Sequence, residues 1–382
     1  MIRIPLASPD VTEAEIDAVT TVMRTNTLSI GPELEQFESA LAQYHSIPFA
    51  ITVSSGTAAL HLAIRALGIG EGDEVIVPSF TFIAVANAVR FEHATPVFVD
   101  IDATTLNMDP ASAEAAITER TRAMVVVHTF GVPAEMDALA TIARKHGIAM
   151  IEDACEAIGA SFRDQLAGTF GDIATLAFYP NKQMTTGEGG ALLTRDASLA
   201  TRLQALRNQG RYPSSDWLQH TELGYNYRLS EMACALGRVQ LARLDAMLEQ
   251  RATVAQQYDN LLSSIPALER PVLVLPHGTI SWFVYVIRVR AHLKAGARDR
   301  VMQALQEAGI GCGRYFAPIH QQPAYADYKQ AQEARLPMTE SIAQRTLALP
   351  FFNKISPLEM KEVATVLQQA LEDETSSVNY LP

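Results

Sequence analysis

The chain has 382 residues, of which 48% are hydrophobic, and its formal net charge is −12. This length and apolar content exclude a disordered protein and predict two or three globular domains. The negative charge argues against a protein that binds nucleic acid or an acidic membrane over a broad face, because both would require a basic surface. A local basic pocket for an anionic substrate stays compatible with it.

The sequence also carries signals about the compartment. No apolar run approaches the roughly 18 to 20 residues of a membrane span, and MIRIPLASPDVTEAE lacks the apolar core of a signal peptide. The cysteines, Cys155, Cys234 and Cys312, form no CxxC pair, so we expect reduced thiols. These features predict a cytoplasmic protein without a membrane anchor.

Taken in chain order, the elements begin with two helices. TEAEIDAVTTVMR opens with a capping box from Thr12 to Glu15, and Pro32 stands at a first helical position. Apolar runs that alternate with helical patterns then predict a mostly parallel sheet covered on both sides, an α/β fold. The runs are FAITV (49–53), EVIVP (74–78), TPVFVD (95–100), AMVVVH (123–128), IAMIED (148–153), IATLAF (173–178) and GALLT (190–194).

The pattern changes from about Leu229, where a long helical stretch begins. Beyond it, SWFVYVIRVR alternates as an amphipathic strand and ARDRVMQALQEAG has the pattern of a helix, which indicates a smaller α+β unit. We therefore predict a large domain over residues 1–245 and a small C-terminal domain over residues 246–382.

Ligands of an open parallel sheet collect outside the carboxyl ends of its strands. At the first such end, in SSGTAALHLAIRAL, Gly56 would let the backbone approach a ligand, and Ser55 and Thr57 offer hydroxyls. The following helix would present free N–H groups, so the turn could be a phosphate cup. Taken alone, an SGT turn before a helix is more often an ordinary N-cap.

Two further strand ends carry candidate residues. After Pro78, Phe80 and Phe82 lie two apart, so one could face the core while the other covers a flat ligand; the residues alone favour both in the core. A later strand ends in Glu152 and Asp153. A carboxylate there is costly unless it pairs with a cation or a protonated nitrogen, so Asp153 requires a partner, unless it caps a helix. The acidic pair does not suggest a metal, because no histidine stands at ligand spacing.

Lys182 lies in FYPNKQMTTGEGG, after an aromatic turn. An ammonium beside a cleft of low dielectric loses hydration, which favours the neutral, nucleophilic amine. The small residues that follow, Thr185, Thr186, Gly187, Gly189 and Gly190, are expected to leave room for a planar ligand. A phosphate cup, an aromatic cover, a buried carboxylate and a reachable lysine, in this order, are what a pyridoxal 5'-phosphate (PLP) site requires. The carboxylate would keep the pyridine nitrogen protonated, and the lysine would form the resting Schiff base.

The chain also resembles the DegT/DnrJ/EryC1/StrS nucleotide-sugar aminotransferases, which are fold-type I PLP enzymes. The resemblance covers nearly the whole chain and is carried by LSIGPELEQFESALAQYH, VSSGTAALHLAIRALGIGEGDEVIVPSFTFIAVANAV, VFVDID, IEDACEAIGA, FYPNKQMTTGEGG, ELGYNYRLSEMACALGRVQL, RYFAPIHQQPAY and LALPFF. It implies that Lys182 forms the Schiff base, that Asp153 contacts the pyridine nitrogen, that Phe82 stacks on the ring, and that Gly56 and Thr57 hold the phosphate.

The resemblance also implies an active site shared between two subunits. Asn226, in GYNYR, would reach the phosphate bound to the second subunit, so the active unit is expected to be a homodimer. His320, in PIHQQPAY, belongs to a loop that lines the sugar-nucleotide pocket in the family.

Two positions depart from the common family pattern. Ala177 stands where the family commonly has a phosphate-binding serine, so cofactor affinity is expected to depend more on Ser55, Thr57 and the partner's Asn226. Glu156 stands near the cofactor's ring oxygen where many members have glutamine, and members resembling perosamine synthases have glutamate.

The expected reaction is transamination, because dehydrating members of the family replace the lysine with histidine. An amino acid, by resemblance L-glutamate, would leave its nitrogen on the cofactor, and that amine would then condense with the keto group of a nucleotide-linked sugar. Freed Lys182 would move a proton between cofactor and sugar carbons. The TTGEGG ending resembles members that aminate C4, so we expect a 4-keto-6-deoxyhexose as acceptor, in polysaccharide or glycoconjugate biosynthesis.

Two other classes stay open from the sequence. One is a different PLP reaction on the same fold, such as sugar dehydration or aldol cleavage. The other is a non-catalytic regulator that binds the cofactor or a sugar nucleotide. Lys182, Asp153 and the GYNYR loop argue against the regulator, and no DNA-binding module is visible to support it.

Overall fold

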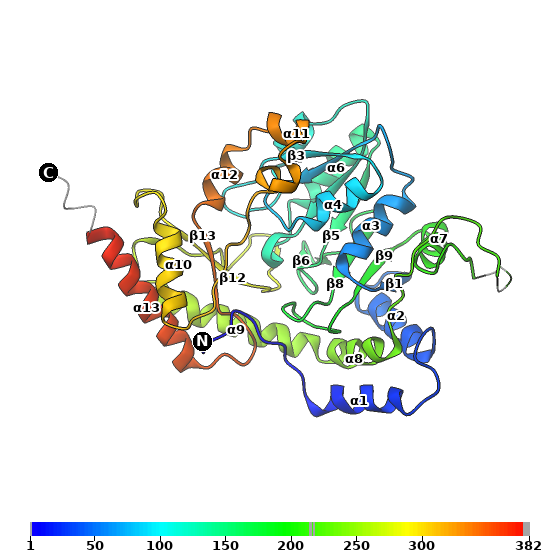
Figure 1. Ribbon diagram of the computed structural model, residues 1–382, viewed down its shortest axis with the longest axis horizontal. Helices are drawn as coiled ribbons and strands as arrows, with labels where there is room; N and C mark the ends of the chain where they lie inside the picture. The colour runs from blue at the N-terminus through cyan, green and yellow to red at the C-terminus, as the bar shows by residue number, and fades with distance from the viewer. Residues whose placement is uncertain (1, 214–215, 217, 377–382) are drawn as a thin grey trace.

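The computed structural model describes residues 2–213, 216 and 218–376 (Figure 1). Its helices are α1 Glu13–Met23, α2 Pro32–Tyr44, α3 Gly56–Ala66, α4 Ala84–Phe91, α5 Pro110–Ala115, α6 Met136–His146, α7 Ala197–Arg207, α8 Glu231–Ala242, α9 Leu244–Leu262, α10 Ala297–Glu307, α11 Lys329–Glu333, α12 Pro337–Ala343 and α13 Pro357–Ser376, with short 3₁₀ turns η1 Thr129–Gly131, η2 Ile319–Gln321 and η3 Pro323–Tyr325. Its strands are β1 Phe49–Val53, β2 Glu74–Pro78, β3 Thr95–Val99, β4 Thr121–Val127, β5 Ala149–Asp153, β6 Ser161–Phe162, β7 Gln165–Leu166, β8 Ile173–Ala177, β9 Gly190–Thr194, β10 Leu268–Glu269, β11 Gly278–Thr279, β12 Tyr285–Val289 and β13 Thr346–Leu349.

The central sheet has seven strands in the order β1-β9-β8-β5-β4-β2-β3. Strands β3, β2, β4, β5 and β8 pair in parallel, while β9 is antiparallel to both of its neighbours, β8 and β1. Each of the seven predicted apolar runs forms one of these strands, so the predicted mostly parallel sheet is confirmed. Because β9 alone is reversed, β1 ends at the same edge as the parallel strands.

Both faces of the sheet are buried, as the unbroken apolar runs predict. Successive residues of β2 alternate: Val75 and Val77 belong to a core with α3, α4 and α7, whereas Ile76 belongs to the core of the opposite face, with α5 and α6. Helices α2 and α8 cover the β8–β9 part of that opposite face. The predicted helix starts are also confirmed, since Thr12 and Glu15 form a capping box and Pro32 opens α2.

The C-terminal part packs around a second core. Its three-stranded sheet, β10-β12-β13, is covered by α9, α10 and α13. The N-terminal segment joins this part, because Ile4 forms a bridge with Ile310 and is buried in the second core. Segments of the two predicted domains also pair directly in a small sheet, β11-β6-β7. The boundary at residue 245 falls at the start of α9 and stays a prediction.

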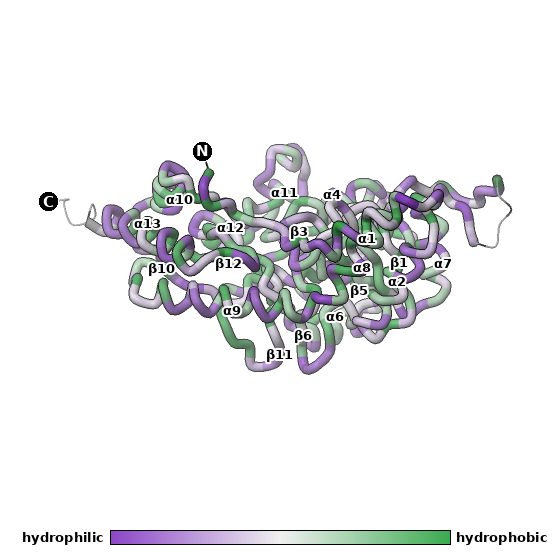
Figure 2. Tube along the Cα trace, turned by 90° about the horizontal axis from the view of Figure 1, so that it is seen from below, coloured by the Kyte–Doolittle hydropathy of each residue, from purple (hydrophilic) through white to green (hydrophobic). Residues whose placement is uncertain are grey.

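The molecule is elongated, with α13 at one end and α7 at the other (Figure 2). None of the helices in the described ranges combines the length and the hydropathy that a membrane span requires.

Candidate active site

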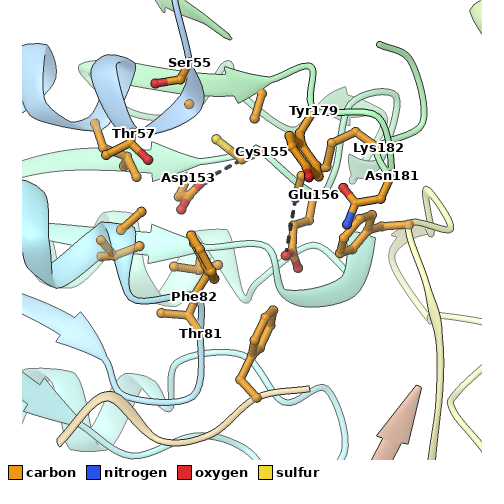
Figure 3. A pocket seen from close by; sticks show the side chains of 18 of the residues that line it. Ser55, Thr57, Thr81, Phe82, Asp153, Cys155, Glu156, Tyr179, Asn181 and Lys182 are labelled. Carbon is orange, nitrogen blue, oxygen red and sulfur yellow. Dashed lines mark hydrogen bonds and ion pairs between the residues drawn. The ribbon is translucent and has the colours of Figure 1, made fainter. Parts of the chain in front are cut away.

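A cavity of about 430 Å³ lies at the carboxyl edge of the central sheet. Its wall includes residues at or just beyond the ends of β1, β2, β4, β5 and β8, where the strand-end rule predicts a ligand. The structure brings together most of the predicted site residues in this wall (Figure 3), namely Ser55, Gly56, Thr57, Phe82, Asp153, Glu156, Ala177 and Lys182.

The start of α3 forms one end of the cavity. Ser55 is the N-cap, and its Oγ accepts a hydrogen bond from the N–H of Ala58 at 3.0 Å, so the N-cap interpretation of this serine is confirmed. The N–H groups of Gly56 and Thr57 belong to the first turn, where a helix offers no intrahelical acceptor. A Cβ on Gly56 would stand 2.7 Å from the Cβ of Ala177, so a glycine is required here. This helix end is suited to hold an anion.

Asp153 and Glu152 point to opposite faces of β5 because strand side chains alternate. Oδ1 of Asp153 accepts from the N–H of Cys155 at 3.1 Å, and its carboxylate lines the cavity. Turns, not a helix, follow this strand, so the capping interpretation of Asp153 is wrong. Glu152 is fully buried on the other face, where it accepts backbone N–H bonds from Gly168 at 2.7 Å and Gly171 at 2.6 Å. Glu152 therefore has a structural role.

The rings of Phe80 and Phe82 point in different directions, as the alternation of side chains at a strand end allows. Phe80 is fully buried, whereas Phe82 is 59% exposed and lines the cavity. The preference for both rings in the core is therefore wrong, and the structure leaves the Phe82 ring free to cover a flat ligand.

Lys182 lies opposite the helix end, beside Glu156 (Figure 3). Its Nζ is 3.5 Å from Oε1 of Glu156 and 4.0 Å from the centre of the Phe283 ring. The other carboxylate oxygen of Glu156 accepts the N–H of Phe130 at 2.9 Å. Burial raises the pKa of Glu156, against the opposing effect of the Lys182 ammonium.

Most of the small residues after Lys182 lie outside the lining of the cavity. Of the five named above, Gly189 alone lines the cavity. A Cβ on Gly190 would lie 2.6 Å from the backbone of Ser55, because β9 pairs with β1 at this point. The glycine therefore permits close backbone packing behind the phosphate cup, and the expected room for a ligand at Gly190 is absent.

Comparison with known proteins identifies the chain. The model of the DegT/DnrJ/EryC1/StrS aminotransferase family matches residues 9–368. The chain belongs to this family. It is 38% identical to a GDP-perosamine synthase from Caulobacter vibrioides over 97% of this chain and 98% of that protein. It is 36% identical to the spore coat polysaccharide biosynthesis protein SpsC from Bacillus subtilis, with 97% of each chain covered.

Solved structures agree with this membership. The PLP form of Spr1654 from Streptococcus pneumoniae superposes with a TM-score of 0.90 and 27% identity, covering 97% of this chain and 99% of the other. The resemblance read from the sequence, the α/β fold class and the aminotransferase class of the enzyme are thereby confirmed.

The residues present fit PLP by their chemistry. A helix N-terminus with free N–H groups suits a phosphate, the Asp153 carboxylate suits a protonated ring nitrogen, and the Lys182 amine suits a carbonyl carbon. All three groups line one cavity. A residue larger than glycine at position 56 would place its Cβ against Ala177 at the end of this cavity. Among the described residues, no cluster of His, Cys, Asp and Glu could hold a metal ion.

Two predicted residues lie outside the lining of this cavity. Asn226 is exposed and bridges to Asn208, a position compatible with a contact to a second subunit. His320 is buried, with Nδ1 2.7 Å from Oγ of Ser79 and Nε2 3.3 Å from Oε1 of Glu340. Their expected roles toward the phosphate and the sugar nucleotide stay predictions.

Sequence reasoning did not select several lining residues. Tyr179 and Asn181 stand in the same quoted stretch as Lys182, and Arg314 and Tyr315 stand in RYFAPIH, so membership in a matching motif was the available signal. Cys155 lines the cavity near Gly56, and burial holds the pKa of its thiol well above the usual range. Cys155 also stands in a matching stretch, IEDACEAIGA, but its spacing from the other cysteines indicated only a reduced thiol.

Proposed function

We propose that this chain is a PLP-dependent sugar aminotransferase. It transfers the amino group of an amino acid, L-glutamate by family resemblance, to the keto group of a nucleotide-linked 4-keto-6-deoxyhexose for polysaccharide or glycoconjugate biosynthesis. The observation that carries the proposal is the common wall on which Lys182, Asp153 and the N-terminus of α3 lie. The names of two relatives, a GDP-perosamine synthase and a spore coat polysaccharide biosynthesis protein, support the sugar acceptor.

PLP, when bound, supplies an electron sink that stabilises negative charge on the reacting carbon. The proposed tasks of the protein are binding and proton transfer. Gly56 and Thr57 bind the phosphate through their N–H groups, with Ser55 holding the turn, and Asp153 keeps a proton on the ring nitrogen. Phe82 covers the ring. Lys182 first holds the cofactor and then, as a free amine, moves a proton between carbon atoms.

Glu156 has a proposed binding task of its own. Its burial raises its pKa, which favours the carboxylic acid over the carboxylate. A protonated Glu156 can donate a hydrogen bond to the ring oxygen of the cofactor, which a carboxylate cannot do. The Phe130 N–H fixes the other oxygen of the same group at 2.9 Å.

We also propose that the protein acts as a homodimer in the cytoplasm. Asn226 of each chain would contact the phosphate held by the other chain, which accounts for an exposed asparagine in a motif of the family. His320 would order the loop beside the sugar nucleotide through its bonds to Ser79 and Glu340.

Replacement of Lys182 by alanine tests the proposal directly. The purified variant should lack the visible absorbance of lysine-bound PLP and should release no 2-oxoglutarate from L-glutamate, while the wild type does both. Lys329→Ala is the matched control, because Lys329 is an exposed lysine that forms an ion pair with the exposed Glu333. Retained turnover in the Lys182 variant would refute the assignment. Absence of 2-oxoglutarate from the wild type, with turnover of a sugar, would favour dehydration instead.

The acceptor is tested with a panel of keto sugars. UDP-, GDP- and dTDP-linked 4-keto-6-deoxyhexoses should be compared with 3-keto isomers, and the amino sugar products identified by mass spectrometry. Amination of a 3-keto sugar alone would contradict the proposed position.

A further inference from the structure

The C-terminal part of the chain contributes to the wall of the cavity. Its lining residues are Phe283, in the loop before β12, and the segment 314–316. Phe283 contacts the reactive amine itself, because the centre of its ring lies 4.0 Å from Nζ of Lys182. The face of an aromatic ring attracts a positive charge within about 6 Å of its centre. The ring is therefore placed to interact with the Lys182 amine whenever that amine carries a proton.

The fold holds the Phe283 ring in place from two directions. The side chain is buried in a core that also contains Phe80 and Phe130. The backbone is held by the buried guanidinium of Arg251, from α9, which donates to the carbonyl oxygens of Trp282 at 2.8 Å and of Phe283 at 3.1 Å. The position of the ring is thus set by packing and by hydrogen bonds of the chain itself.

A second set of bonds ties the loop of Lys182 to the same segment. Nε2 of Gln183, the residue after Lys182, donates to the carbonyl oxygen of Ser281 at 3.0 Å and to that of Glu156 at 2.6 Å. Gln183 and Ser281 are both buried. These bonds fix the backbone beside Lys182 relative to Phe283, so the contact between the amine and the ring is built into the fold.

The Lys182 amine also lies beside a carboxyl group. Its Nζ is 3.5 Å from Oε1 of Glu156, whose other oxygen accepts the N–H of Phe130 at 2.9 Å. The ring and the carboxyl group together give the free amine a defined place. A long lysine side chain otherwise has many rotamers, and a reacting group that is already placed avoids the entropy cost of finding its position during the reaction.

A defined place matters while Lys182 is not bound to the cofactor. In the proposed amino acid half, the free amine takes a proton from the α carbon of the donor, carries it as an ammonium, and delivers it to a carbon of the cofactor. In the sugar half it carries a proton the opposite way, from that carbon to the sugar carbon. The ammonium is the form that the face of the Phe283 ring attracts, so the ring would stabilise the carrier between the two transfers.

We propose that Phe283 is a positioning residue that holds the released Lys182 amine during proton transfer. This inference rests on the proposed aminotransferase function. It predicts that the negative face of the ring is needed for proton transfer in both halves of the reaction and that the ring contributes little to the binding of PLP.

Fluorination of the ring tests the proposal in purified holoenzyme. Difluoro- and pentafluorophenylalanine at position 283 keep nearly the shape of phenylalanine but withdraw negative charge from its face. The rate of the amino acid half, followed by 2-oxoglutarate release in a single turnover with L-glutamate, should fall stepwise. The expected total loss is roughly 2- to 30-fold, the range of a cation–π interaction. The Kd of PLP should stay within about twofold.

Two controls locate the effect. Pentafluorophenylalanine at Phe352, a buried residue of the second core outside the cavity lining, should leave the rate unchanged. L-glutamate with deuterium on its α carbon should react more slowly than ordinary L-glutamate, by a factor at least as large in the fluorinated proteins as in wild type. Phe283→Leu should show the full loss of rate, and Phe283→Tyr, which keeps a ring face, should recover most of it.

Chemical labelling of the PLP-free chain gives a readout that does not depend on turnover. The side chain of Lys182 is 13% exposed and that of Lys329 is 76% exposed, so acetic anhydride should label Lys182 more slowly. Mass spectrometry of the two peptides gives the ratio of the rates, with Lys329 as the internal control. Phe283→Leu uncovers the amine on one side and should raise the relative rate of Lys182 several-fold. An unchanged ratio would show that the ring does not hold the amine.

Three kinetic results would also overturn the inference. Equal rates across the fluorinated series would show that the ring acts by its shape alone. A slower reaction without a deuterium isotope effect would place the loss in another step. A Kd of PLP that rises in parallel with the loss of rate would show that the ring binds the cofactor. A wild type that is inert toward L-glutamate and other amino acids would refute the proposed function itself, while the labelling ratio would still test the contact.

Discussion

Replacement of Gly56 by alanine tests the structure of the phosphate cup. Gly56 begins α3 and its φ is not in the left-handed region, so an alanine suffers no backbone strain there. The new Cβ would instead stand 2.7 Å from the Cβ of Ala177 and 3.1 Å from Sγ of Cys155. The first distance is far shorter than a carbon–carbon contact of about 3.5 to 4.0 Å, so the start of the helix must move.

Overpacking of this kind costs about 1 to 3 kcal/mol. Because the displaced backbone carries the N–H groups that we propose bind the phosphate, most of the cost should appear as weaker PLP binding. A loss of 1.4 kcal/mol corresponds to a tenfold higher Kd, so Gly56→Ala should raise the Kd of PLP about tenfold or more. Removal of the opposing methyl group, in Gly56→Ala with Ala177→Gly, leaves the Ala177 Cα at 3.6 Å and should restore most of the affinity.

The assay is a PLP titration of the cofactor-free protein, followed by absorbance, for wild type, both single variants and the double variant. Ala177→Gly alone weakens β8 by about 0.5 to 1 kcal/mol, so its own effect must be measured. The expected result is a coupling free energy of about 1 to 2 kcal/mol between the two positions. Purely additive losses would refute the reasoning, because they would mean that the two side chains do not meet at the cup.

Three further outcomes are expected. Ala177→Ser should lower the Kd of PLP about tenfold, since a hydrogen bond from the new hydroxyl to a charged group contributes about 1.5 kcal/mol or more. An unchanged Kd in the same titration would mean that the serine hydroxyl lies outside the cup. Glu152→Gln should lower the melting temperature at every pH, because Glu152 accepts several buried N–H groups and an amide nitrogen cannot accept them, whereas Glu156→Gln should not do so at neutral pH. Burial raises the pKa of Glu156, so the folded protein binds a proton at this residue more tightly than the unfolded protein does. In a series of melting curves, wild type should therefore lose stability relative to Glu156→Gln as the pH rises above about 4.5, since both proteins keep Lys182 and Asp153. The opposite trend would contradict a raised pKa.

The fold could be predicted because its signals are local. Each strand of the central sheet is a short run that is apolar on both faces, such as EVIVP, and burial on both faces is what such a run requires. The reversal of β9 could not be predicted in this way. GALLT has the same apolar pattern as its parallel neighbours, and strand direction depends on the course of the loop 178–189 between β8 and β9.

The cofactor end of the site was predictable for a related reason. Asp153 ends a strand, Ser55 and Lys182 each follow one, and the ends of parallel strands meet at one edge. The directions of the side chains were harder to predict from the sequence. Phe80 and Phe82 are equivalent by composition, and only the turn after β2 decides which of them faces the cavity.

The substrate end of the site follows from the packing of the C-terminal part on the sheet. Phe283 and the segment 314–316 reach the cavity across a sequence separation that no local pattern encodes, and they pack in a core that also contains Phe80 and Phe130. We therefore propose that the two parts of the cavity wall divide the binding: the strand ends would bind the cofactor, and the returning segments would contact the substrate. Changes at Arg314 or Tyr315 should therefore alter KM for the sugar while the Kd of PLP stays within about twofold, because additivity is expected for positions that share no partner with the phosphate cup.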